Sequence, residues 1–162
     1  MVAGATSAAG LAAIQRMGAR VRLLSALSGA LELMHSEITF NFTPLPALTA
    51  LLCRRAAPPV RPFFQHCTRL FQQLGEESVQ ALWHKAVCEA AVDWRAGERE
   101  ALMDLGAALG RYDHQAQARA LELTQNRIET LLARAESERA RQGRVFGTLG
   151  VACGLAIVII LF

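Results

Sequence analysis

The sequence lacks the short motifs that hold phosphates or zinc in many enzymes. It has no glycine-rich loop ending in Gly-Lys-Ser or Gly-Lys-Thr, so the chain is not itself a P-loop ATPase. It also has no His-Glu-x-x-His and no Cys-x-x-Cys segment. His84 and Cys88 have a spacing that can place two ligands on one helix face, but no third ligand is evident. We therefore predict no catalytic residue, cofactor or metal, and a membrane-bound metalloenzyme is the weakest alternative.

Cysteine and lysine are both scarce. The four cysteines fit neither a disulfide framework nor a metal motif, which favours buried, reduced thiols. Cys53, Cys67 and Cys88 lie at apolar positions of predicted helices, and Cys153 lies in the C-terminal apolar run. Lys85 is the single lysine, because sixteen of the seventeen basic residues are arginine. The arginines are scattered, no aromatic residues interleave with them, and the net charge is only +3. This distribution argues against nucleic-acid binding.

β-type alternation, internal repeats and long linkers are absent too, and what remains is a chain of helices. Apolar residues make up 52% of the sequence and recur with the period of a helix, so we predict an all-α fold, a compact bundle of about six helices. The first strong helix covers about residues 18–40. Its apolar stripe is formed by Leu24, Leu27, Leu31, Met34 and Ile38.

Small and polar residues indicate the other helix ends. Thr43 is predicted to cap the second helix, with Pro44 at the first helical position, where a missing N–H costs nothing. The other predicted boundaries are Gly75 at the end of the third helix, Ser78 as cap of the fourth, Gly97 as a break before the fifth, Gly110 at its end and Asp113 as cap of the sixth.

An apolar run lies at each end of the chain. Residues 145–162 form eighteen uncharged residues, about 27 Å of helix, and predict a C-terminal transmembrane helix within 142–162. Residues 2–14 are apolar but small, and reach only roughly 20 Å as a helix. We interpret residues 1–17 as a short, weak membrane helix, with an amphipathic arm as the alternative. Residues 18–141 then form the helical domain.

Arginines flank both runs on the side of this domain. They are Arg16, Arg20 and Arg22 after the first run, and Arg139, Arg141 and Arg144 before the second. The positive-inside rule therefore predicts that the domain faces the cytoplasm.

Four glycines share one face of the C-terminal segment: Gly143, Gly147, Gly150 and Gly154. Glycine lets membrane helices approach closely, so this face is predicted to pack against the N-terminal run or another subunit. The alternative is that glycine is simply common in membrane helices.

The segment from Glu37 to Pro46 is predicted to form a corner between two helices. Glu37 borders an apolar stripe, and a carboxylate there needs a partner to offset its desolvation. It either bonds inward to the start of the second helix or contacts a partner protein. Asp113, by contrast, is fully explained as a helix cap.

The order of these features resembles the stage III sporulation protein AB family of endospore-forming bacteria. The resemblance is carried by E-I-x-x-x-x-T-P-L at 37–45 and L-G-x-x-D-x-x-x-Q at 109–117, with further matching segments at 20–24, 63–64, 81–83 and 149–161. Glu37, Asp113 and Gln117 match the family's motif. The resemblance implies that these three residues either face an ATPase or fix the fold.

The resemblance also implies a function. It implies a non-enzymatic membrane platform in the mother-cell membrane around the forespore, with two membrane helices and a cytoplasmic domain similar to type II secretion system F proteins. Its expected partners are a cytoplasmic ATPase of the same sporulation operon, other membrane proteins of the channel between mother cell and forespore, and a further copy of the chain. The N-terminal run departs from the family by being short and alanine-rich. A tail-anchored helical adaptor of unrelated function is the alternative.

Overall fold

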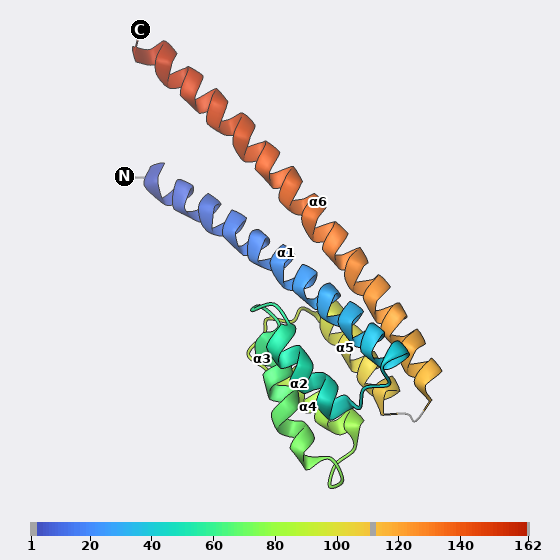
Figure 1. The fold of residues 1–162 in the computed structure, drawn as a ribbon. Coiled ribbons are helices and arrows are strands. Elements are labelled where there is room, and N and C mark those ends of the chain that lie inside the picture. The colour runs from blue at the N-terminus through green and yellow to red at the C-terminus, as the bar shows by residue number, and fades with distance from the viewer. Residues whose placement is uncertain (1–2, 111–112, 162) are drawn as a thin grey trace. The chain divides into compact units, whose positions relative to one another are not determined.

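The computed structural model describes the backbone of residues 3–110 and 113–161, and the side chains of residues 15–110 and 113–141. These residues form six α-helices and no β-strand, which confirms the all-α prediction (Figure 1). In chain order the elements are α1 (Ala3–Phe40), α2 (Leu45–Arg55), α3 (Arg61–Leu70), the short 3-10 helix η1 (Phe71–Gln73), α4 (Val79–Glu89), α5 (Ala96–Leu109) and α6 (His114–Leu161).

The chain divides into two compact units. One unit comprises Leu23–Leu131, and the other combines Met1–Arg22 with Leu132–Phe162. The first unit holds α2 to α5 whole, together with the adjoining parts of α1 and α6. In the second unit, side chains are described only for residues 15–22 and 132–141. The functional argument therefore concerns the first unit.

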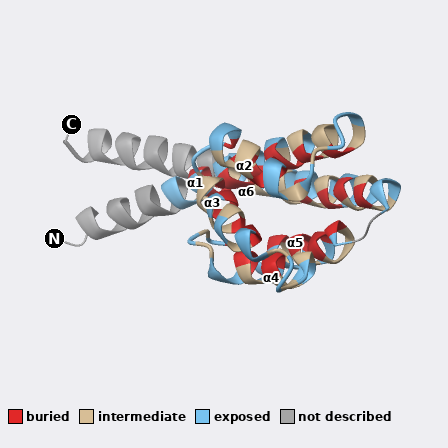
Figure 2. Ribbon diagram, turned by 60° about the horizontal axis from the view of Figure 1, so that its bottom comes forward, coloured by how far each residue is buried: buried red, intermediate tan, exposed pale blue. Residues whose placement is uncertain are grey.

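An apolar stripe on α1 forms one wall of that unit's core. All five stripe residues predicted for this helix are buried, namely Leu24, Leu27, Leu31, Met34 and Ile38. Figure 2 shows buried residues on the inner sides of the helices of this unit. Each such side chain removed from water stabilises the fold by roughly 1.5–3 kcal/mol.

Aromatic rings join α3 to α4 and to the connection that precedes α5. The Phe63 ring meets Trp83 edge-on at 5.2 Å and Trp94 at 5.6 Å between centroids. The indole Nε1 of Trp83 donates to the Leu102 carbonyl at 2.7 Å, which ties α4 to α5. Gly106 makes this packing possible, because a Cβ there would lie 2.4 Å from Trp83 Cδ1.

Among the helix boundaries predicted between α3 and α5, one is wrong and the others are close. Ser78 caps α4 by accepting the Ala81 N–H at 3.2 Å, as predicted. Gly75 turns the chain with a φ of +115°, close to the predicted end of the third helix. The α3 helix itself ends at Leu70, and η1 lies between it and Gly75. The predicted break at Gly97 is wrong, since Gly97 lies inside the first turn of α5. The buried Glu98 carboxylate accepts the Arg95 N–H at 2.7 Å and so holds the start of the helix around that glycine.

The cysteines differ in exposure. Cys67 is buried, and burial raises the pKa of its thiol far above the usual range. Cys53 is half-buried, whereas Cys88 is exposed. The prediction that Cys88 belongs to the core is wrong, because α4 turns Leu82, Trp83, Ala86 and Val87 inward and leaves position 88 outside.

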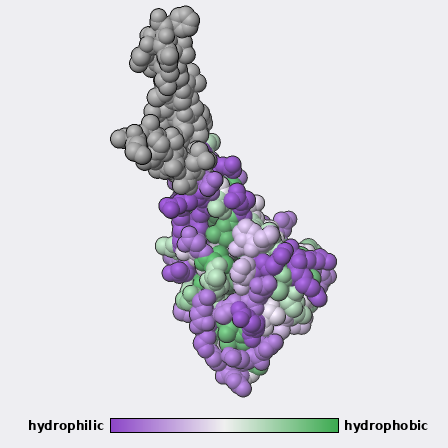
Figure 3. Space-filling model, turned by 90° about the vertical axis from the view of Figure 1, so that its left-hand side faces the viewer, coloured by the Kyte–Doolittle hydropathy of each residue, from purple (hydrophilic) through white to green (hydrophobic). Residues whose placement is uncertain are grey.

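Within the part of the chain whose side chains are described, no helix is long and apolar enough to cross a membrane. Residues 142–162, the predicted transmembrane segment with Gly143, Gly147, Gly150 and Gly154, lie outside those residues, as do residues 1–14. On the face drawn in Figure 3, hydrophilic residues surround apolar patches.

Candidate functional site at the corner between α1 and α2

Glu37 organises the corner with both its side chain and its main chain. Its carboxylate accepts a hydrogen bond from the Thr43 hydroxyl at 2.7 Å. Its main-chain carbonyl accepts the N–H groups of Asn41 at 3.2 Å and Thr43 at 3.1 Å. One residue of α1 therefore fixes the path of the chain as far as the start of α2. The carboxylate bonds inward, to the connection rather than to the first turn of α2.

The predicted role of Thr43 as a helix cap is wrong. The α2 helix begins at Leu45, so Pro44 is its N-cap and not, as predicted, its first helical residue; the Pro44 carbonyl accepts the Leu48 N–H at 2.9 Å. Thr43 makes no capping bond because its hydroxyl is turned back toward Glu37. Pro46 occupies the first turn, where the missing N–H has no helical acceptor to lose.

The corner keeps Glu37 ionised. Hydrogen bonds from the side chains of Thr43 and Asn41 lower the pKa of Glu37 below its ordinary value, and the charge of Arg55 adds to this effect. Partial desolvation raises the pKa of Glu37, but by less than either hydrogen bond lowers it. The carboxylate is thus a hydrogen-bond acceptor at neutral pH and cannot donate a proton there.

Two phenylalanines project from the corner into solvent. Phe40 is 73% exposed and Phe42 is 62% exposed, and with Leu123 they are the exposed large apolar residues of the described chain. Phe42 has φ +51°, in the left-handed region that bulky residues rarely adopt. Such a conformation costs on the order of 1–2 kcal/mol, so the surrounding bonds must hold it.

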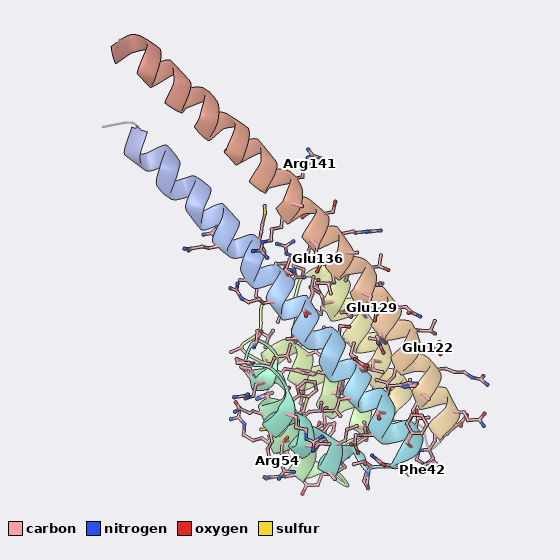
Figure 4. All side chains as sticks on the ribbon, turned by 45° about the horizontal axis from the view of Figure 1, so that its top comes forward. Phe42, Arg54, Glu122, Glu129, Glu136 and Arg141 are labelled. Atoms are coloured by element: carbon pink, nitrogen blue, oxygen red, sulfur yellow. The ribbon has the colours of Figure 1, made fainter. Side chains whose placement is uncertain are left out.

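Phe42 also connects the corner to the start of α6. Its ring meets the His114 imidazole edge-on, with centroids 5.4 Å apart and planes at 85°. Figure 4 labels Phe42 at this place, near the first turn of α6. The 37–45 and 109–117 motifs are therefore neighbours in space.

Asp113 and Gln117 join α5 to α6. Asp113 caps α6 as predicted, because its carboxylate accepts the Gln115 N–H at 2.9 Å. The buried Gln117 side chain donates from Nε2 to the Leu109 carbonyl at 3.0 Å. That carbonyl belongs to the last turn of α5, where carbonyls have no partner within their own helix. Both side chains thus have a fold-fixing contact.

The sequence prediction did not single out Phe40, Phe42 or His114 as site residues. A signal was available for Phe40, since it lies two positions beyond Ile38 and therefore off the buried stripe of α1. No sequence signal places His114 against Phe42, because this contact joins residues far apart in the chain.

No metal site is evident in the described side chains, which contain no group of three or more potential ligands. Cys88 Sγ lies 3.9 Å from His84 Nδ1, and both residues are exposed on α4. A structural or catalytic zinc site needs further ligands. What the corner offers is a contact surface, with two apolar rings held on a braced turn.

Comparison with known proteins gives a consistent result. The family model described as stage III sporulation protein AB matches residues 1–162. The chain is 25% identical over 144 residues to a protein named stage III sporulation protein AB from Bacillus subtilis (strain 168), covering 88% of this chain and 84% of that one. It is also similar in fold to a solved structure of a stage III sporulation protein AB, with a TM-score of 0.67 at 24% identity, covering 74% of this chain and 94% of the other.

Proposed function

Because the chain belongs to the stage III sporulation protein AB family, we propose that it is a non-enzymatic membrane platform of the sporulation assembly, on which a cytoplasmic ATPase docks. The platform would lie in the mother-cell membrane around the forespore, with its helical unit in the cytoplasm. The family assignment favours this function over an adaptor unrelated to sporulation.

The docking proposal rests on the corner between α1 and α2, where Phe40 and Phe42 are exposed and the hydrogen bonds of Glu37 hold the turn. Exposed phenylalanines are costly to keep in water, and aromatic residues are enriched at the centres of protein interfaces. Here Phe42 is also held in a rare backbone conformation by bonds that converge on Glu37. Backbone strain of this kind is often found at ligand-binding sites.

Membrane attachment is supported by the sequence. Residues 145–162 carry no charge and are long enough to span the hydrocarbon core, while residues 2–14 are shorter. Arginines before the last run and after the first favour a cytoplasmic helical unit. Protease treatment of membrane vesicles with the cytoplasmic side outward would test this topology, since protection of residues 20–140 from cleavage would contradict it.

The docking proposal is tested with the full chain in detergent and the ATPase encoded beside it. Changing Phe40 and Phe42 together to serine is expected to weaken binding at least roughly tenfold, the loss typical of truncating an interface anchor. The matched control is Leu123→Ser, because Leu123 is equally exposed, at 71%, but lies on α6 away from the corner motif. Equal binding by the double variant and the control would refute docking at the corner.

A further inference from the structure

The charges of the chain are divided unevenly between its two units. Residues 1–22 and 132–162 hold seven arginines and two glutamates, which gives this unit a net charge of +5. Residues 23–131 hold ten basic and twelve acidic residues, a net charge of −2. The seven arginines, which we call the basic collar, all lie along the chain between an apolar run and the other unit: Arg16, Arg20, Arg22, Arg134, Arg139, Arg141 and Arg144. The corner and its proposed partner make no use of this positive charge.

Most of the basic collar is available to an external anion. Five of its side chains are exposed, and among the side chains that the structure describes they form no hydrogen bond or ion pair: Arg16, Arg22, Arg134, Arg139 and Arg141. Arg127 differs from them, because it contacts Glu100 at 2.6 Å and Asp104 at 3.2 Å within the chain. The collar therefore carries positive charge that the described carboxylates do not neutralise.

The collar reaches the depth of lipid headgroups when the apolar runs enter the membrane. Both α1 and α6 continue from the collar into these runs as single helices. At about 1.5 Å per residue, Arg16 is roughly 3 Å beyond the first run, and Arg141 is roughly 6 Å before the second. Arg22 extends back by one turn, since a Cβ on Gly18 would lie 3.3 Å from Arg22 Nη1. The headgroup layer is roughly 5–8 Å thick on each side of the hydrocarbon core, so its phosphates are within reach of these side chains.

The collar surrounds its helices rather than forming one pocket. Arg139 and Arg141 are two residues apart, so they leave α6 on roughly opposite sides, and Figure 4 shows Arg141 extending from the helix into solvent. A single free phosphate would need several donors that converge on one point. Lipid headgroups, by contrast, surround a membrane helix on every side. A guanidinium suits them because it donates two parallel N–H bonds to phosphate oxygens.

We infer that the basic collar binds the phosphodiester groups of anionic phospholipids and so enriches these lipids over zwitterionic ones around the apolar runs. This binding rests on the proposed membrane attachment, because the collar meets lipid only when the runs enter the membrane. Each arginine close to an anionic membrane surface strengthens association by roughly fivefold. The positive-inside rule requires only that arginines stay on the cytoplasmic side. A preference among lipids is an additional property of unpaired guanidinium groups at headgroup depth.

Electron spin resonance of spin-labelled lipids measures this preference. The full chain is reconstituted in phosphatidylcholine vesicles with a trace of spin-labelled phosphatidylglycerol or phosphatidylcholine, and the motionally restricted fraction of each label gives their relative association constant. Phosphatidylglycerol should associate at least roughly threefold more strongly than phosphatidylcholine, and Arg139→Gln with Arg141→Gln should lower this ratio at least roughly twofold. The matched control is Arg99→Gln with Arg119→Gln, which removes the same charge from exposed arginines of residues 23–131 and should keep the ratio.

The possible negative results have different meanings. Equal restricted fractions for the two lipids would overturn lipid selection and leave the proposed membrane attachment intact. No restricted fraction for either lipid would refute the attachment itself. An equal loss in the collar variant and the control would show a general effect of net charge and would overturn binding at the collar. Inorganic phosphate should lower the ratio no more than chloride at equal ionic strength, because screening is then the same, and a larger loss in phosphate would show a site for a soluble anion instead.

Discussion

Replacing Gly106 by alanine is expected to destabilise the unit through Trp83. A Cβ at position 106 would lie 2.4 Å from Trp83 Cδ1, 3.0 Å from Cγ and 3.2 Å from Nε1. The indole is only 1% exposed and is fixed by its 2.7 Å bond to the Leu102 carbonyl, so it cannot swing into solvent. The ring or the α4–α5 spacing must shift, and that bond lengthens or breaks.

The magnitude follows from three contributions. Overpacking a core costs about 1–3 kcal/mol, and a weakened buried hydrogen bond costs about 1 kcal/mol or more. Alanine gives back about 1 kcal/mol, because glycine is the poorer helix former. We therefore expect a net loss of about 2 kcal/mol in the free energy of unfolding.

Chemical denaturation of the full chain in detergent, followed by tryptophan fluorescence, measures this loss. Gly29→Ala is the matched control, since Gly29 is exposed on α1 and its added Cβ would meet nothing within 4 Å. The control should be more stable than the wild type by roughly 0.5–1 kcal/mol. If Gly106→Ala is stabilised as much as Gly29→Ala, the argument for a tight glycine–indole contact fails.

Four further predictions concern the corner, the α5–α6 joint and α4. Phe42→Gly removes the strain of the left-handed backbone, so the thermal midpoint should stay unchanged or rise. Binding of the ATPase should weaken, and unchanged binding would show that the Phe42 ring does not contact the ATPase. Because the folded-state pKa of Glu37 is lowered, its contribution to stability is present above the unfolded pKa and is lost as pH falls through the folded one. The stability difference between the wild type and Glu37→Gln in urea should thus shrink from pH 7 to pH 3, and a constant difference would contradict an ionised acceptor. Gln117→Leu leaves the Leu109 carbonyl without its donor and should cost about 1–3 kcal/mol by thermal unfolding, whereas the exposed Gln115→Leu should change little. Purified protein should hold less than one equivalent of metal by elemental analysis, and stoichiometric metal lost in His84→Ala would restore the metalloenzyme alternative.

The sequence predicted local structure well where one periodic signal dominated. The stripe from Leu24 to Ile38 has the spacing of a helix face, and burial follows directly from that spacing. Ser78 and Asp113 were predictable as caps because a cap acts on N–H groups two or three residues away. These contacts involve no distant part of the chain.

Predictions failed where a nearby residue competed for the same group. Thr43 has the chemistry of a cap, but its hydroxyl instead donates a hydrogen bond to the Glu37 carboxylate. Gly97 was interpreted as a break, but Glu98 holds the start of α5 around it. Two contacts depend on how the helices pack: that of Phe42 with His114 and that of Trp83 with Gly106. A single sequence contains no direct signal for either contact.

The braced corner has a consequence for the thermodynamics of recognition. A flexible loop loses conformational entropy when a partner immobilises it, and this loss reduces its affinity. The bonds from Thr43 and Asn41 to Glu37 order this turn during folding, before any partner arrives. Thr43→Val, which removes the hydroxyl but touches neither phenylalanine ring, should therefore weaken docking mainly through a less favourable binding entropy. Residues behind an interface can in this way set its affinity without contacting the partner.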